Sequence, residues 1–200
     1  MDAELSGQLV VPDGARGVVL FAHGSGSSGR SPRNRYVAAA LNEAGLGTLL
    51  FDLLTPEEEY DRANVFDIEL LAGRLLTATE RVREQPAAAN LPLGYFGAST
   101  GAAAALSAAA EPDADVAAIV SRGGRPDLAG PRLASVRAPT LLIVGGHDEQ
   151  VLELNREAQR ELGGESRLEI VPGATHLFEE PGALDQVADL TGSWFVTHFT

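Results

Sequence analysis

A stretch in the middle of the chain changes from strand-like to helix-like character within a few residues. A short apolar run begins at Leu93, and an alanine-rich run that favours helix continues through residues 102–106. Between them lies Gly97-Ala98-Ser99-Thr100-Gly101. A strand that turns directly into a helix strains the backbone of its central residue, and glycine two positions away on each side removes the Cβ atoms that would collide. The stretch therefore predicts a strand–turn–helix unit with Ser99 at its tip.

The pattern Gly-x-Ser-x-Gly at residues 97–101 matches a nucleophile elbow. Ser99 would project above the sheet at the N-terminus of the following helix, where exposed N–H groups favour a developing negative charge. The alternative is a chance match, since the chain holds 22 glycines. We favour the elbow because the motif lies between a strand-like run and a helix-like run.

Composition bounds the class of protein. Residues 1–200 are enough for one domain with a sizeable core, and no apolar run approaches the length of a membrane span. The first six residues lack the basic-then-apolar layout of a secretory signal, and the absence of cysteine rules out disulfides and thiolate metal sites. The net charge of −13 argues against a nucleic-acid or anionic-membrane surface. We expect one cytoplasmic domain, monomeric or homodimeric, that binds neither nucleic acid nor membrane.

Apolar strand-like runs alternate with helix-like runs along the chain. Besides the strand before the elbow, strands are predicted at 7–11, 17–22, 47–52, 116–120, 140–145 and 167–171. Besides the helix after the elbow, helices are predicted at about 33–44, 65–84, 151–162 and 183–199, and the acidic residues 55–64 as a loop. This alternation predicts an α/β fold with a mostly parallel sheet and helices on both faces. Ligands of such sheets bind beyond the carboxyl ends of the strands.

Candidate catalytic residues follow predicted strands. A serine nucleophile needs a base, and His176 lies just past the last strand; it needs an orienting carboxylate, and Asp148 lies just past the strand before. Singly, His176 also fits a surface residue and Asp148 fits the N-cap of the helix near 151. Asp127 follows another strand and is the rival acid. Together the positions predict a triad of Ser99, Asp148 and His176.

These motifs resemble those of the α/β-hydrolase superfamily, particularly small cap-less members related to dienelactone hydrolase. The resemblance covers nearly the whole chain, and its phrases are the elbow, Val18–Gly24, Pro139–Gly145 and Pro172–Phe178. The chain order Ser99, Asp148, His176 is the order of that superfamily. The segment Ser121–Leu128 is similar to the hydrolase-type domain that occurs fused to phosphoribosyltransferases. Dienelactone hydrolases proper use a cysteine nucleophile, whereas this chain has serine at position 99 and no cysteine. This departure counts against the dienelactone substrate and leaves the expected fold untouched.

The resemblance also implies an oxyanion hole made by two backbone N–H groups. One belongs to Thr100, directly after the nucleophile, and the other to Ser25, in a glycine-rich loop where Gly24 and Gly26 let the backbone approach closely. We expect His23, at the start of that loop, to be structural rather than a base.

Substrate contacts are predicted less directly. Arg122 follows the strand at 116–120, where it forms either a surface ion pair or a site for a substrate carboxylate or phosphate. Residues 121–139 are too few and too rich in proline for a helical cap, so the expected pocket is shallow and open. Its expected apolar contacts are Leu53, Leu54 and Phe178, and the expected substrates have short acyl groups.

The predicted function is therefore that of a serine hydrolase, which cleaves small carboxylic esters through an acyl-enzyme without a metal or organic cofactor. Two alternatives remain open at the level of sequence. One is a thioesterase or other acyl hydrolase. The other is a non-catalytic accessory domain of the same fold, because fold does not fix function.

Overall fold

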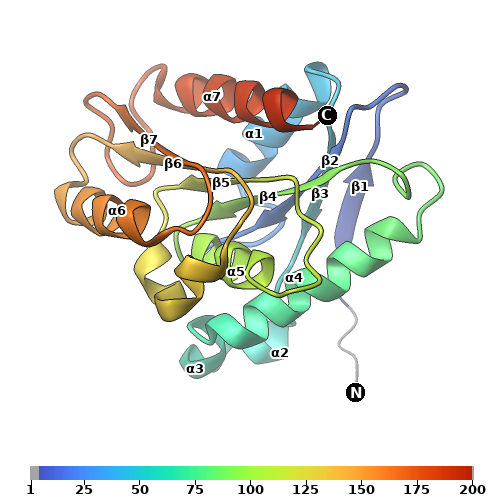
Figure 1. The fold of residues 1–200 in the computed structure, drawn as a ribbon, viewed down its shortest axis with the longest axis horizontal. Coiled ribbons are helices and arrows are strands. Elements are labelled where there is room, and N and C mark those ends of the chain that lie inside the picture. Colours follow the sequence, from blue (N-terminus) through green and yellow to red (C-terminus); the bar gives the residue numbers. More distant parts are fainter. Residues whose placement is uncertain (1–4, 200) are drawn as a thin grey trace.

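A computed structural model describes residues 5–199, and these form a seven-stranded sheet in the order β1-β3-β2-β4-β5-β6-β7 (Figure 1). The strands are β1 (Gly7–Val10), β2 (Val18–Ala22), β3 (Gly47–Phe51), β4 (Leu93–Ala98), β5 (Ala118–Arg122), β6 (Thr140–Gly145) and β7 (Ser166–Val171). Only β1 pairs antiparallel with its neighbour, β3; the other pairs are parallel. The predicted mostly parallel α/β sheet is confirmed.

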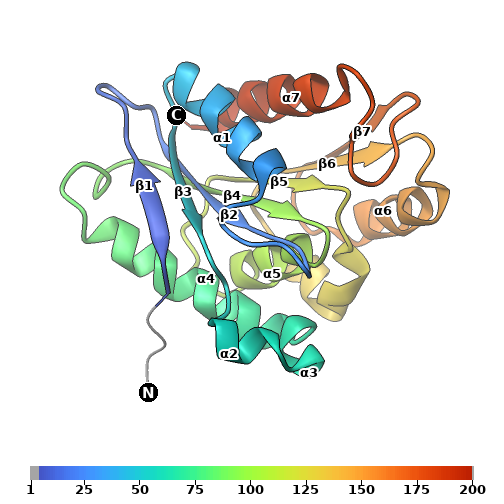
Figure 2. The ribbon, with the colours of Figure 1, turned by 180° about the vertical axis from the view of Figure 1, so that it is seen from behind.

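Helices cover both faces of the sheet (Figures 1 and 2). They are α1 (Pro32–Glu43), α2 (Pro56–Glu59), α3 (Arg62–Val65), α4 (Ile68–Arg83), α5 (Thr100–Ala109), the 3₁₀ segment η1 (Pro126–Ser135), α6 (Glu149–Glu161) and α7 (Ala183–His198). Helices α1 and α7 pack together on one face, and α4, α5, η1 and α6 cover the other. A separate hydrophobic cluster fills each interface.

The inner strands explain why the sequence shows continuous apolar runs. Every residue of β2, β4, β5 and β6 is buried, because helices cover both faces of these strands. The edge strands β1 and β7 are mostly half-buried or exposed, and their sequences are correspondingly more polar. The sheet thus holds four strand ends rigidly beside one another, at the edge where the predicted site residues lie.

Helix α5 is buried along its whole length. Its alanines leave little side-chain volume, so it packs closely against α4, η1 and the sheet. The element that carries the predicted elbow is therefore the central helix of its face.

Residues 55–64 are not the loop that the sequence led us to expect. Thr55 and Glu58 form a capping box that starts α2, with the Glu58 N–H donating to Thr55 Oγ1 at 3.3 Å and the Thr55 N–H to Glu58 Oε2 at 2.9 Å. Asp61 caps α3 in turn through the Ala63 N–H at 2.9 Å. The loop prediction was wrong because it weighed acidity over these caps.

Strand β5 lies two residues later than expected, at Ala118–Arg122 rather than 116–120. Arg122 is consequently the last residue of a buried strand and is itself buried. Between Arg122 and Thr140 the chain forms η1, which packs against α5 and α6 and adds no cap over the strand ends. No helix within residues 5–199 is long and apolar enough to span a membrane.

Candidate active site

The turn between β4 and α5 has the strained geometry expected of an elbow. Ser99 has φ 52° and ψ −121°, a conformation that costs free energy for any residue with a side chain. A Cβ at Gly97 would lie 2.4 Å from Ala102 Cα, and one at Gly101 would lie 2.1 Å from the carbonyl oxygen of Ala22. Both positions therefore require glycine, Gly97 because the turn closes on itself and Gly101 because α5 presses against the end of β2.

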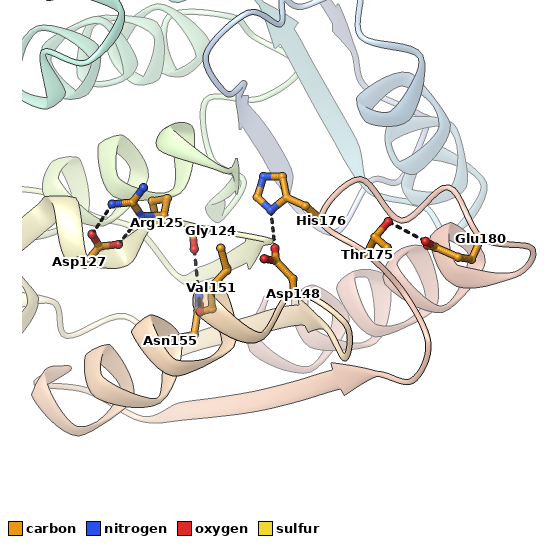
Figure 3. Close-up of polar contacts among 9 residues, drawn as sticks. All are labelled: Gly124, Arg125, Asp127, Asp148, Val151, Asn155, Thr175, His176 and Glu180. Atoms are coloured by element: carbon orange, nitrogen blue, oxygen red, sulfur yellow. Dashed lines mark hydrogen bonds and ion pairs between the residues drawn. The ribbon is translucent and has the colours of Figure 1, made fainter.

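Asp148 and His176 meet at the carboxyl ends of β6 and β7. His176 Nδ1 lies 2.6 Å from Asp148 Oδ2 (Figure 3). Asp148 immediately precedes α6, yet among residues 5–199 its side chain makes no capping hydrogen bond. The Asp148 side chain is 16% exposed and that of His176 is 38% exposed, so the pair is partly shielded from water. The carboxylate can thus hold the imidazole in one orientation and stabilise its charged form.

The rival acid, Asp127, is engaged elsewhere. Its two carboxylate oxygens accept hydrogen bonds from Nε and Nη2 of Arg125 at 2.9 and 2.8 Å (Figure 3). This fork-to-fork pair satisfies both partners. The structure therefore brings Asp148, rather than Asp127, to His176.

Two further contacts hold the loops of the site in place, and sequence reasoning missed both. Buried Asn155 donates through Nδ2 to the carbonyl oxygens of Gly124, at 3.0 Å, and Val151, at 2.8 Å, which fastens α6 to the loop after β5. Thr175 Oγ1 donates to Glu180 Oε1 at 2.6 Å across the His176 loop (Figure 3), and this bond lowers the pKa of Glu180. Asn155 had a visible signal, an amide one turn after Val151 on the apolar face of its helix.

A cavity of about 500 Å³ opens beside the elbow, and Ser99, His176 and Arg122 all line it. Among the described residues no hydrogen bond joins the Ser99 hydroxyl to the His176 ring. In many enzymes this bond becomes short and well aligned only with substrate in place. The nucleophile and base candidates therefore share one cavity wall.

The residues expected to form the oxyanion hole are also neighbours. The Ser25 N–H donates to Thr100 Oγ1 at 2.9 Å. Gly24 brings the loop against the elbow, since a Cβ there would lie 2.9 Å from Ser99 Cβ. A substrate oxyanion at the Ser25 N–H would have to displace the Thr100 hydroxyl.

His23 has the structural position expected from the sequence. It is 6% exposed, its Nε2 accepts the Leu53 N–H at 3.0 Å, and its Nδ1 lies 3.0 Å from the Gly24 carbonyl oxygen. These contacts assign the neutral tautomer with the proton on Nδ1. Burial lowers the pKa of His23, which keeps the ring neutral at pH 7. The ring anchors the glycine-rich loop to the chain after β3.

Arg122 is not the exposed member of a surface ion pair, one of the two roles that the sequence left open. Its side chain belongs to a residue that is 8% exposed, and among residues 5–199 its Nε and Nη1 find no hydrogen-bond partner. The guanidinium lies over the Phe178 ring, 5.9 Å from its centroid. Burial, with the like charge of Arg33, lowers the pKa of Arg122 to about 10, so the group remains charged at neutral pH.

The apolar residues expected at the pocket wall lie beneath it instead. Leu53 is fully buried in the cluster of the α4–α5 face, and Phe178 in the cluster of the α1–α7 face. Leu54 borders a separate void of about 20 Å³. Neither Leu53 nor Phe178 lines the cavity beside the elbow, because both side chains are packed in the core. Within residues 5–199 no three His, Cys, Asp or Glu side chains gather where they could share a metal ion.

No family model matches the chain. A solved structure of dienelactone hydrolase from Anabaena variabilis ATCC 29413 is 57% identical, covers 98% of this chain and 93% of that one, and superposes with a TM-score of 0.94. This chain belongs to the dienelactone hydrolase family. Est1E from Butyrivibrio proteoclasticus superposes with a TM-score of 0.80 at 15% identity over 97% of this chain and 94% of that one, a likeness of fold alone.

Two curated relatives of this member of the dienelactone hydrolase family are longer than the chain itself. Both come from Mycobacterium tuberculosis, strains CDC 1551 and H37Rv, and are provisionally named phosphoribosyl transferases. Each is 66% identical over 194 residues, which are 97% of this chain and 44% of the relative. The chain thus spans less than half the length of these relatives, which agrees with a hydrolase domain fused to a phosphoribosyltransferase.

Proposed function

We propose that this chain is a serine hydrolase that cleaves small carboxylic esters through an acyl-enzyme, with Ser99 as nucleophile, His176 as base and Asp148 as orienting acid. One observation carries the proposal. His176, whose Nδ1 lies 2.6 Å from Asp148 Oδ2, lines the same cavity as Ser99, which stands at a strained turn. A nucleophile, a base and a third group that orients the base are the parts that acyl transfer needs.

In the first half of the reaction, His176 Nε2 takes the proton of the Ser99 hydroxyl as Oγ attacks the ester carbonyl carbon. The imidazole becomes positively charged, and the Asp148 carboxylate at Nδ1 stabilises that charge. The carbonyl oxygen gains negative charge at the N-terminus of α5, where the Thr100 N–H and the Ser25 N–H are the proposed donors. The tetrahedral intermediate collapses, His176 gives its proton to the departing alkoxide, and an acyl-Ser99 ester and the free alcohol remain.

In the second half, water replaces the alcohol. His176 takes a proton from water as the water oxygen attacks the acyl carbon. The bond from the acyl carbon to the Ser99 oxygen then breaks, and His176 gives the proton to that oxygen. The net result is one ester and one water converted into an acid and an alcohol. No step requires a metal or an organic cofactor.

Labelling with a fluorophosphonate, followed by peptide mapping, tests this proposal. We expect one label, on the peptide that contains Ser99, because the reagent phosphonylates a serine only when a neighbouring base activates it. The His176→Ala variant is the control and should label far more slowly. Unlabelled wild-type protein would contradict the proposal and favour the non-catalytic alternative. Matched oxygen esters and thioesters of one acyl group then separate an esterase from a thioesterase.

A further inference from the structure

The candidate cavity carries a positive charge that the proposed hydrolysis does not use. Its described lining includes three arginines, Arg30, Arg33 and Arg122, and no aspartate or glutamate. We call these three residues the arginine cluster. The whole chain holds 28 acidic residues against 15 basic ones. The cavity wall is therefore positively charged in a protein whose net charge is negative. This contrast indicates that the positive charge has a role at the cavity.

Arg122 is the most informative member of the arginine cluster. Its Nε and Nη1 are buried and have no hydrogen-bond partner among residues 5–199, and no carboxylate there offsets a charge that lies over the face of the Phe178 ring. A buried charge without a counter-charge is unfavourable for folding. Its place is fixed relative to the elbow, since it lies opposite Ala98 in the β4–β5 pairing and its carbonyl oxygen accepts the Ser99 N–H. Buried polar groups without a partner are uncommon in native proteins, and a bound anion is one group that would complete a buried guanidinium beside a cavity.

Arg33 brings a second guanidinium to the same wall, from the first turn of α1. Its Nη1 pairs with Glu179 Oε1 at 3.1 Å, while its Nε is buried and unpartnered among the described residues. Arg33 and Arg122 line the same cavity, and the charge of Arg33 adds to burial in lowering the pKa of Arg122. Two like charges are held together there at a cost that an anion between them would remove.

We propose that the arginine cluster binds a phosphate group carried by the ester substrate. This assignment rests on the proposed function for the position of the reacting bond. Glu179 offsets one charge of the cluster, and the ion pairs among residues 5–199 leave the charges of Arg30 and Arg122 unpaired. Two unpaired positive charges match the two negative charges of a phosphate dianion. A single carboxylate would neutralise only one of the two guanidinium groups.

The rest of the wall also suits phosphate. Ser27, Ser28 and Ser31 line the same cavity, so their hydroxyl groups add donors beside the guanidinium forks. Ser31 is also the N-cap of the twelve-residue α1, whose positive end therefore borders the cavity. A tetrahedral anion with three free oxygens can use donors from several directions at once.

The test compares three aryl acetates that release a phenol and differ only in their para group: 4-acetoxyphenylphosphonate, 4-acetoxybenzoate and 4-acetoxybenzamide. At pH 8 these carry a dianion, a monoanion and no charge, with the same acetyl group in each. We expect wild-type kcat/KM to rise in the order amide, carboxylate, phosphonate, with phosphonate at least about tenfold above amide, the ratio that one hydrogen bond to a charged group supports. Equal values for all three would overturn the arginine cluster as a subsite, and a carboxylate value above phosphonate would overturn the phosphate assignment.

Arg122→Gln is the decisive variant, and Arg125→Gln is its matched control. Arg125 lies in the same segment, is already neutralised by Asp127 and does not line the cavity. We expect Arg122→Gln to raise KM for the phosphonate about tenfold to hundredfold, with little change in kcat or in the amide substrate, and Arg125→Gln to change neither. The Tm of Arg122→Gln should equal or exceed that of wild type, because this substitution removes a buried charge that has no counter-charge. If Arg122→Gln does not fold, Arg33→Gln should show the same selective rise in KM; equal effects on phosphonate and amide would overturn the proposal.

A binding measurement separates this inference from the proposed function. Calorimetric titration of the Ser99→Ala variant with phenylphosphonate, benzoate and benzamide reports on the cluster whether or not the protein hydrolyses esters. We expect phenylphosphonate to bind most tightly and its binding to be lost in Ser99→Ala/Arg122→Gln. Absence of phenylphosphonate binding would overturn the inference even if ester hydrolysis is established, and phenylphosphonate binding would support it even if hydrolysis fails.

Discussion

The Ser99 N–H donates a hydrogen bond to the carbonyl oxygen of Arg122 at 3.3 Å. Three residues further on, the Arg125 N–H donates back to the Ser99 carbonyl oxygen at 3.0 Å. The strained residue is thus fastened on both sides to the segment that follows β5. This pairing fixes the proposed nucleophile relative to the arginine cluster, so the reacting bond and the proposed phosphate subsite have one rigid frame.

That frame depends on glycine at position 101. A Cβ there would lie 2.1 Å from the Ala22 carbonyl oxygen, a backbone atom that cannot move aside cheaply. We expect Gly101→Ala to lower the free energy of unfolding by about 2–3 kcal/mol, as overpacking does. Urea denaturation measures this. Gly73→Ala is the control, since a Cβ at that exposed position in α4 has open space, and it should gain about 0.5–1 kcal/mol. Equal stability of Gly101→Ala and wild type would contradict the packing argument.

The pairing of His176 with Asp148 predicts which carboxylate matters for turnover. We expect Asp148→Asn to lower kcat by about 10⁴-fold, because the amide favours the wrong imidazole tautomer and cannot stabilise its charged form. Asp127→Asn breaks only the pair with Arg125 and should keep kcat within about tenfold of wild type, because a partly exposed ion pair contributes at most about 1 kcal/mol. Steady-state kinetics on p-nitrophenyl acetate measures both. A larger loss in Asp127→Asn would show that the acid is misassigned.

Buried His23 makes the free energy of unfolding fall as the pH is lowered. Burial lowers its pKa below the ordinary 6.5, so the unfolded chain takes up the proton first as pH falls. The stability from neutral His23 is complete above about pH 6.5 and is lost as pH falls from there through the lowered folded value. An NMR titration of the ring should show a midpoint below 6.5. A midpoint at or above 6.5 would contradict the buried, neutral assignment.

Some of this geometry was readable in the sequence, because close contacts leave their mark on residue type. Gly97 and Gly101 indicated the elbow, and the apolar runs of β2, β4 and β6 indicated buried parallel strands. Asp148 and His176 were readable as partners because both follow neighbouring strands.

Other features were hidden because they depend on burial. The sequence left Arg122 open as either a surface ion pair or a substrate contact, because a strand ending at residue 120 gave no sign of burial. The structure shows Arg122 as the buried last residue of β5, in the lining of the cavity. An apolar side chain such as Leu53 or Phe178 suits both a pocket wall and the core behind it. The sequence therefore could not tell which of the two places these residues occupy, and the structure shows both buried in the core. In contrast, the helices α2 and α3 were predictable from the Thr55 and Asp61 caps.

The cavity wall predicts a preference for short acyl groups. The cavity is about 500 Å³ and is lined mainly by serine, glycine and arginine, with few apolar side chains. A long acyl chain gains roughly 25 cal/mol for each Å² of apolar area it buries, and this wall offers little such area. We expect kcat/KM for p-nitrophenyl esters to be highest from acetyl to about butyryl and to fall as the acyl chain lengthens. The measurement covers acyl chains up to about twelve carbons. A rise towards the long chains would contradict the open, polar pocket.

The central claim, that the Ser99 hydroxyl is the nucleophile, is tested most directly by the hydrolysis rate of Ser99→Ala on p-nitrophenyl acetate. The substitution removes one oxygen and leaves the backbone contacts to Arg122 and Arg125 in place. Far-ultraviolet circular dichroism and Tm verify that the fold persists. We predict that kcat falls by about 10⁶-fold, the scale of nucleophile removal in a serine hydrolase. Hydrolysis at the wild-type rate by a purified, folded Ser99→Ala protein would contradict the account.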